Sequence, residues 1–233
     1  MSNRTLLWVF AHPDDESFAC GGTIARYAAN GWRTVLYCAT RGDAGSPGTP
    51  PLCTPEQLGD VRADELSRAA RVLGLDRVIL RDYGDGRLTQ YPQNELTRDI
   101  RQVIREEKPE VVITFPAEGI SGHPDHRVIH QATVKAVQGL SQCVPRLYFV
   151  VIPGSVGRKS VPFPTPDDQV THQIEVSPYR EQIMRALQQH RTQHRSIERV
   201  FPGVMQGEWK SLRTREYYQA ANPANDTPPD RLA

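Results

Sequence analysis

Short apolar runs alternate with segments of helical periodicity over the first 150 residues, and this alternation constrains the fold most. The apolar runs predict buried strands at 6–10, 34–40, 77–80, 111–115 and 147–152. The helical patterns between them predict helices at 17–30, 55–73, 94–107 and 124–138. Continuously apolar strands separated by helices are typical of a parallel sheet covered on both faces. Right-handed crossovers then predict a Rossmann-like, doubly wound α/β sheet in the order 3-2-1-4-5.

The pattern weakens after residue 153. We expect a long loop at 154–166, a further strand at 173–176 and a helix at 179–193. The proline-rich end predicts a flexible tail at 223–233. A chain of 233 residues suits one α/β domain, so we assign 1–222 to a single domain, a mostly parallel sheet flanked by helices with a C-terminal extension.

Charge and apolar content exclude several classes of protein. Lys and Arg number 28 against 27 Asp and Glu, and this balance argues against a dedicated nucleic-acid binder. No apolar run approaches the ~20 residues that span a bilayer, and the first run leads into acidic residues unlike a signal peptide. We therefore expect a cytoplasmic protein without membrane partners, with a homo-oligomer left open.

The four cysteines form no C-x-x-C pair, which argues against a cysteine zinc site. We interpret Cys20, Cys38, Cys53 and Cys143 as small hydrophobic residues in a reducing compartment.

Two His-Pro-Asp clusters follow predicted strands. Residues 11–16 (AHPDDE) come directly after the first strand, and residues 122–126 (GHPDH) come a few residues after the fourth. Each has two polar side chains three positions apart, and each has a proline suited to the first turn of a helix. Strands one and four are neighbours in the predicted order, so both clusters should meet at the switch point of the sheet.

Imidazole and carboxylate groups gathered at one point predict a metal site. Two histidines and one carboxylate form a common catalytic zinc set that leaves one position for water, so we assign His12, Asp15 and His126 as ligands. Asp14 is the candidate general base. Taken singly, each cluster is also explained as a helix cap. His130 is a weaker candidate for a fourth ligand, and we expect His172 and His194 to be exposed.

Several motifs together resemble those of the PIG-L/LmbE-like N-acetylglucosaminyl deacetylases. AHPDDES precedes Gly21-Gly22, and GHPDH follows about 110 residues later. The resemblance spans about residues 5–195 and includes three shorter motifs: Arg41-Gly42-Asp43, Arg62-x-x-Glu65 and Ala186-Leu187-x-x-His190-x-x-Gln193. Whether His190 and Gln193 line the pocket or only pack a helix stays open.

The resemblance implies a mechanism. One zinc per chain, with iron(II) also suited to the ligands, would activate water for attack on an acetamide. Asp14 would take the proton of the water and return it to the leaving amine. His123 would stabilise the oxyanion as an imidazolium, and Asp125 would orient or charge-balance His123. The products would be acetate and a glucosamine-type amine.

The substrate is less constrained. Arg62, Arg41 and Asp43 are the candidate substrate-binding residues; the alternatives are a salt bridge of Arg62 with a neighbouring carboxylate and ordinary turn chemistry at the other two. The motifs look most like the deacetylases of low-molecular-weight thiol biosynthesis, of the bacillithiol or mycothiol type, which act on GlcNAc-malate or GlcNAc-inositol. Deacetylation of chitobiose or an antibiotic glycoside, and amidase action on a thiol S-conjugate or other non-sugar amide, are the alternatives. A nucleotide-binding module would require a Gly-x-Gly-x-x-Gly turn that the chain lacks after its first strand.

Overall fold

The computed structural model describes the chain except residues 1–3, 143, 158–160, 211, 223–227 and 229. Its centre is a seven-stranded sheet in the order β3-β2-β1-β4-β5-β7-β6. The strands are β1 (Thr5–Phe10), β2 (Arg33–Thr40), β3 (Arg77–Tyr83), β4 (Val111–Thr114), β5 (Arg146–Val151), β6 (His172–Glu175) and β7 (Arg215–Ala220). The first five are parallel and lie in the predicted order, which confirms the doubly wound core.

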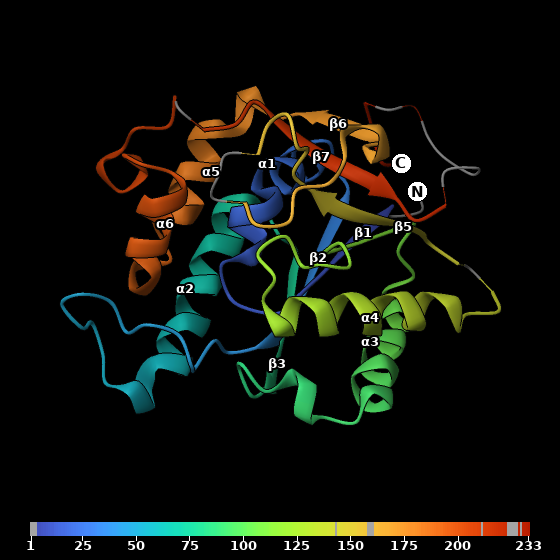
Figure 1. Ribbon diagram of the computed structural model, residues 1–233, viewed down its shortest axis with the longest axis horizontal. Helices are drawn as coiled ribbons and strands as arrows, with labels where there is room; N and C mark the ends of the chain where they lie inside the picture. The colour runs from blue at the N-terminus through green and yellow to red at the C-terminus, as the bar shows by residue number, and fades with distance from the viewer. Residues whose placement is uncertain (1–3, 143, 158–160, 211, 223–227, 229) are drawn as a thin grey trace.

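Helices cover the two faces of the sheet (Figure 1). They are α1 (Asp15–Ala29), α2 (Leu58–Leu73), α3 (Gln93–Glu107), α4 (Pro124–Gln138), α5 (Arg180–Leu187) and α6 (His194–Val200). Helices α3 and α4 pack together on one face, and α1, α2 and α5 pack together on the other. Every residue of β1 is buried, because this strand lies between two neighbours and under both helical layers.

A kink in α1 is held by the C-terminal strand β7. The backbone leaves helical geometry at Cys20, where φ is −151°. The buried carboxylate of Glu216 accepts the N–H groups of Gly22 (2.9 Å) and Thr23 (2.8 Å), and the Arg213 guanidinium donates to the carbonyl of Phe18. Residues of the last strand and its approach therefore satisfy the backbone groups that the kink leaves without helical partners.

Close packing at the same place requires glycine. A Cβ added to Gly22 would lie 2.5 Å from Val176 Cβ, nearer than two carbons can approach. Glycine thus lets α1 lie against the segment between β6 and α5.

The C-terminal third differs most from expectation. The predicted helix at 179–193 ends at Leu187, and residues 191–193 form a separate 3-10 turn. Strand β7 was not predicted; it pairs antiparallel with β5 and β6. His172 is buried rather than exposed because β6 places it against the Tyr148 ring of β5, and His194 is half-buried.

Other expectations are resolved in part. Cys20 and Cys38 are buried, as predicted, whereas Cys53 is half-buried and Cys143 lies outside the described residues. Most of the predicted tail is outside them too, although Leu232 is buried and its N–H donates to the Tyr27 hydroxyl. The assignment of a domain at 1–222 and a tail stays a prediction. Among the described residues, no helix is long and apolar enough to cross a membrane.

Candidate active site

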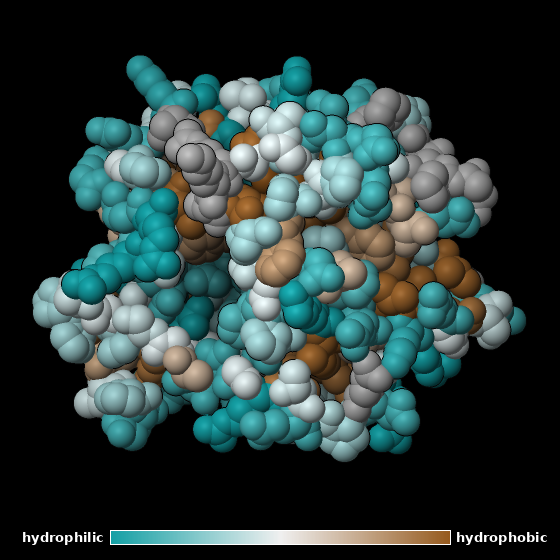
Figure 2. Space-filling model, viewed as in Figure 1, coloured by the Kyte–Doolittle hydropathy of each residue, from teal (hydrophilic) through white to brown (hydrophobic). Residues whose placement is uncertain are grey.

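Loops at the carboxyl edge of the parallel strands surround a cavity of about 550 Å³. The turn after β1, the loop after β2, the turn after β3 and the loop between β4 and α4 all contribute to its wall. Figure 2 shows a hollow in the left half of the molecular face in view, with hydrophilic residues at its floor and hydrophobic residues along its upper rim. This is the sheet edge and the switch point at which doubly wound folds bind ligands.

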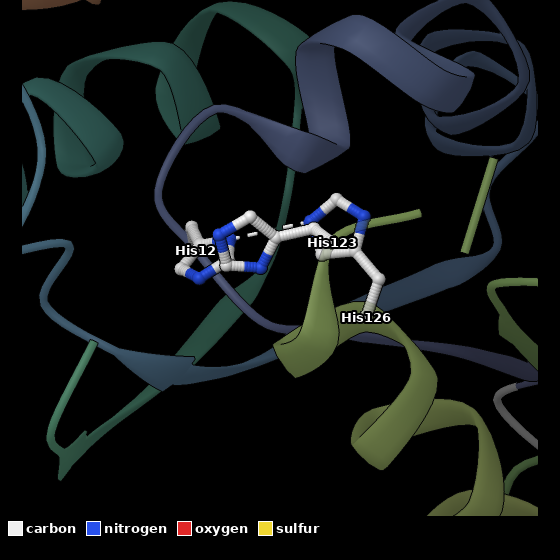
Figure 3. Close-up of side chains that lie close together, drawn as sticks. All are labelled: His12, His123 and His126. Carbon is white, nitrogen blue, oxygen red and sulfur yellow. Dashed lines mark hydrogen bonds between the residues drawn. The ribbon is translucent and has the colours of Figure 1, made fainter. Parts of the chain in front are cut away.

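Both His-Pro-Asp clusters open a helix at this edge, as predicted. Helix α1 begins at Asp15, and α4 begins at Pro124, after His123. Because β1 pairs with β4, these two helix starts face each other. Figure 3 shows the rings of His12, His123 and His126 gathered from the two segments.

Three nitrogen and oxygen donors converge from these segments. His126 Nε2 lies 3.3 Å from His12 Nδ1 and 3.3 Å from Asp15 Oδ1, and His12 Nδ1 lies 3.6 Å from Asp15 Oδ2. The structure thus brings together the three residues assigned as ligands from the sequence.

Hydrogen bonds on the far side of each ring orient the two imidazoles. His12 Nε2 lies 3.0 Å from Asp85 Oδ1 and 3.2 Å from Asp125 Oδ2, and His126 Nδ1 lies 3.0 Å from the carbonyl of Gly119. Carboxylate and carbonyl oxygens accept hydrogen bonds, so each of these nitrogens carries the hydrogen and donates it. The opposite nitrogens, His12 Nδ1 and His126 Nε2, are then left with lone pairs that point at one another.

The donor set fits a divalent metal ion. Two lone pairs and a carboxylate oxygen would repel each other at 3.3 Å unless a cation or proton lay between them. Tetrahedral ligation with bonds of ~2.0–2.2 Å separates neighbouring ligands by roughly 3.4 Å, close to these spacings. His123 with His12 and His126, or Asp85 and Asp125 with His12, also lie close enough to hold a metal. Asp125 is fully buried and already accepts the N–H groups of Gly86 and Leu88, so we place it behind His12.

The charges around the donor cluster of His12, Asp15 and His126 favour a bound positive charge. Burial opposes ionisation of His12, but the carboxylates of Asp125, Asp15 and Asp85 raise the pKa of His12 well above its ordinary value. Burial likewise opposes ionisation of Asp15, but the two histidines hold its pKa well below the ordinary range. A cation bound by these residues would take the place of the proton.

Asp14 projects into the cavity beside this cluster. Its backbone is in the left-handed region, with φ 115°, which is strained for a residue with a side chain. Glu16 accepts the Asp14 N–H at 3.0 Å, and Arg62 lies 3.3 Å from Asp14 Oδ2. Burial raises the pKa of Asp14 to about 6 against the opposing charge of Arg62, a value suited to accepting and returning a proton near neutrality.

His123 differs from the sequence-based expectation in its protonation. Its Nδ1 accepts the N–H of Asp125 at 3.2 Å, and burial, with His12 and His126 nearby, lowers the pKa of His123. The ring is therefore neutral, with its hydrogen on Nε2, and not the expected imidazolium. The Asp125 carboxylate contacts His12, and Asp125 acts on His123 through its N–H and through its charge, which raises the pKa of His123 against the effect of burial; the expected support of His123 by Asp125 stays a prediction.

The three predicted substrate-binding residues lie in different surroundings. Arg62 lines the cavity and is 3% exposed; it donates to the carbonyls of Gly42 and Pro13 and pairs with Asp14. Arg41 pairs with Asp60 and Asp82, and Asp43 is exposed and accepts the Asp85 N–H. Neither Arg41 nor Asp43 lines the cavity, where Ala44 and Gly45 take their place.

Several site residues escaped the sequence analysis. Asp85 follows the predicted third strand in Gly84-Asp85-Gly86, and its position at the carboxyl edge of the sheet was the available signal. Glu16 forms a buried pair with His190 at 2.8 Å. Of the two C-terminal residues left open, Gln193 lines the cavity and His190 does not. His130 contacts the carbonyl of Phe115 and lies outside the donor cluster.

Comparisons with known proteins identify the family. The profile described as "PIG-L: GlcNAc-PI de-N-acetylase" matches residues 7–137. The chain belongs to the PIG-L family. Its curated relatives include two proteins named 1D-myo-inositol 2-acetamido-2-deoxy-alpha-D-glucopyranoside deacetylase. The protein from Mycobacteroides abscessus is 36% identical and aligns over 83% of this chain and 82% of its own length. The protein from Acidothermus cellulolyticus is 33% identical and aligns over 82% of this chain and 80% of its own length.

Solved structures share the fold of this chain. The conserved protein TT1542 from Thermus thermophilus superposes with a TM-score of 0.71 at 29% identity, covering 97% of this chain and 99% of the other. The N,N'-diacetylchitobiose deacetylase of Pyrococcus horikoshii also superposes with a TM-score of 0.71, at 21% identity, and covers 94% of this chain and 84% of the other. As a PIG-L family member, the chain is an N-deacetylase, a hydrolase of N-acetyl amide bonds.

Proposed function

We propose that the protein is a zinc-dependent deacetylase that removes the N-acetyl group from a conjugate of N-acetylglucosamine. The observation that carries this proposal is the convergence of His12 Nδ1, Asp15 Oδ1 and His126 Nε2 beside Asp14 in one cavity. Two imidazoles and one carboxylate are ligands of catalytic zinc, although iron(II) suits the same set. The names of the curated relatives support the class of substrate.

Each residue of the site has one task in this account. Zinc, when bound, lowers the pKa of water and polarises a carbonyl. The Asp14 carboxylate accepts the proton of the attacking water and passes it to the nitrogen of the departing amine. His123 donates its Nε2–H to the oxygen on which negative charge develops. Asp85 and Asp125 hold His12 in the tautomer that leaves Nδ1 free to bind metal.

Arg62 acts through Asp14 in this account. Its guanidinium is occupied by two backbone carbonyls and by the Asp14 carboxylate. This arrangement fixes the strained turn that carries Asp14, and it leaves little of Arg62 for an anionic group such as malate. GlcNAc-inositol is therefore the first conjugate to assay, because the curated relatives bear its name.

An acetate-release assay tests the proposal. The purified protein with one equivalent of zinc should release acetate from GlcNAc-inositol or another N-acetylglucosamine conjugate, and chelation should stop the reaction. GlcNAc-malate, diacetylchitobiose and a thiol S-conjugate complete the panel. Cleavage of the S-conjugate alone would identify an amidase instead, and no release from any of them would overturn the proposal.

A further inference from the structure

The wall of the active-site cavity includes a group of apolar residues in addition to the metal cluster. We call this group the apolar arm; its members are Phe18 of α1, Val150 and Ile152 at the end of β5, Val161, and Val200 and Phe201 at the end of α6. None of these residues belongs to the donor cluster or to its hydrogen-bonded supports. The arm and the donor cluster line the same cavity.

Three polar residues lie beside the arm, and Arg213 and Gln193 are engaged by protein groups whereas Ser196 is exposed. Arg213 donates to the carbonyls of Phe18 and Ala19, and its guanidinium lies 5.3 Å from the centre of the Phe201 ring. The Gln193 side-chain amide donates to the carbonyl of Ser46 at 2.9 Å. A polyol placed in the arm would lose water at several hydroxyl groups and find one exposed partner, the Ser196 hydroxyl, which is unfavourable.

Apolar side chains of the arm remain in contact with water. Val200 is 46% exposed and Phe201 is half-buried, although both lie at a cavity wall. An alkyl or aryl group in the arm would remove this surface from water, and each methylene buried there strengthens binding about fourfold.

We propose that the apolar arm binds an alkyl or aryl group carried by the amino sugar on the side away from its acetamide. The inference rests on the proposed function, in which the acyl group is only a methyl and does not extend into the arm. Because the arm and the donor cluster share one cavity, the occupant of the arm belongs to the molecule that is deacetylated. The arm thus favours an apolar aglycone over a polyhydroxylated one.

The test compares three conjugates of N-acetylglucosamine with the zinc-loaded protein. Methyl and n-hexyl glycosides, each as both anomers, and GlcNAc-inositol are assayed for kcat/KM and for binding by calorimetry. The hexyl glycoside adds five methylenes to the methyl one, and we expect at least ~30-fold higher kcat/KM and affinity for it. The inositol conjugate should fall nearer the methyl glycoside.

Two exposed valines provide a matched pair of variants. Val200 lines the arm, whereas Val156 is 48% exposed and does not line the cavity. Val200→Asp should lower the hexyl-to-methyl ratio of kcat/KM about tenfold, because a charge would lie beside the alkyl chain. Val156→Asp should leave that ratio unchanged, and thermal unfolding of both variants checks that they fold.

The outcomes separate this inference from the proposed function. Equal kcat/KM and affinity for the methyl and hexyl glycosides would overturn the apolar arm and leave the deacetylase standing. Tighter binding of the hexyl glycoside without hydrolysis of any conjugate would support the arm and overturn the deacetylase. Faster hydrolysis of N-hexanoylglucosamine than of hexyl N-acetylglucosaminide would place the apolar group on the acyl side and contradict the proposal.

Discussion

At the scale of single residues, the proposed metal site depends on which nitrogen of each histidine ring carries a proton. His12 and His126 both direct a lone pair into the cavity because their other nitrogen is held by a carboxylate or carbonyl. The side-chain types of the candidate ligands could be predicted from the sequence, because each His-Pro-Asp cluster has two polar side chains three positions apart and follows a predicted strand. The contact between Asp85 and His12 could not, because it depends on how the turn after β3 folds back toward β1.

Replacing Asp14 tests its role as proton carrier. Asp14→Asn keeps the size of the side chain but removes the base, so we expect kcat to fall ~100- to 10,000-fold while zinc affinity changes little. Steady-state kinetics and zinc titration measure the two effects. An active Asp14→Asn variant would remove Asp14 from the mechanism.

Asp125 should act on metal affinity through His12. Asp125→Asn weakens the hold on His12 Nε2, and we expect zinc affinity to fall ~10- to 100-fold. Asp64→Asn is the matched control, since Asp64 of α2 is exposed and outside the cavity wall. Competition with a chromophoric chelator gives both affinities, and equal values for the two variants would show that Asp125 does not support the site.

At the scale of elements, the short segment after α5 ties the active-site walls together. His190 pairs with Glu16 of α1, and Thr192 donates hydrogen bonds to the Glu65 carboxylate of α2. The Gln193 amide donates a hydrogen bond to the carbonyl of Ser46 in the loop after β2. A continuous helix at 179–193 was the natural prediction from periodicity. The chain turns at Gln188–His190 instead, and the 3-10 turn that follows places these side chains on their three partners.

The buried pair of Glu16 and His190 predicts a pH-dependent stability. Burial opposes the charge of both groups, but Glu16 raises the pKa of His190 and His190 lowers that of Glu16. The histidine contribution is complete below its unfolded pKa of ~6.5 and is lost as pH rises through its folded pKa. The glutamate contribution is complete above ~4.3 and is lost as pH falls. The pair therefore stabilises most between about pH 4.5 and 6.5.

Chemical unfolding of His190→Gln measures this contribution. We expect a deficit of about 3 kcal/mol near pH 5.5 that shrinks as pH rises above neutrality. His194→Gln is the control, because His194 is half-buried and contacts only the carbonyl of Arg191 among the contacts described. A His190→Gln deficit that stayed constant from pH 5 to 9 would contradict the charged pair.

At the scale of the whole molecule, the first five strands could be predicted because continuous apolar runs and helical patterns leave one compatible topology. The edge made by β7 and β6 could not, since β7 alternates buried and half-exposed residues and contains Glu216. Burial raises the pKa of Glu216. The charge of its carboxylate is offset in the interior by the two N–H groups at the kink in α1 and by Arg213, Thr23 and the Tyr218 hydroxyl. Local sequence carries no sign of a partner almost 200 residues away.

The fold brings residues 12–15 and 123–126 to one point, and in the proposed function they hold a metal ion there. Zinc content after equilibrium dialysis tests this claim most directly, with the wild type compared with His126→Ala and with His130→Ala, one turn further along α4. We predict about one zinc per chain in the wild type and in His130→Ala, and almost none in His126→Ala. Equal zinc content in His126→Ala and the wild type would contradict the account.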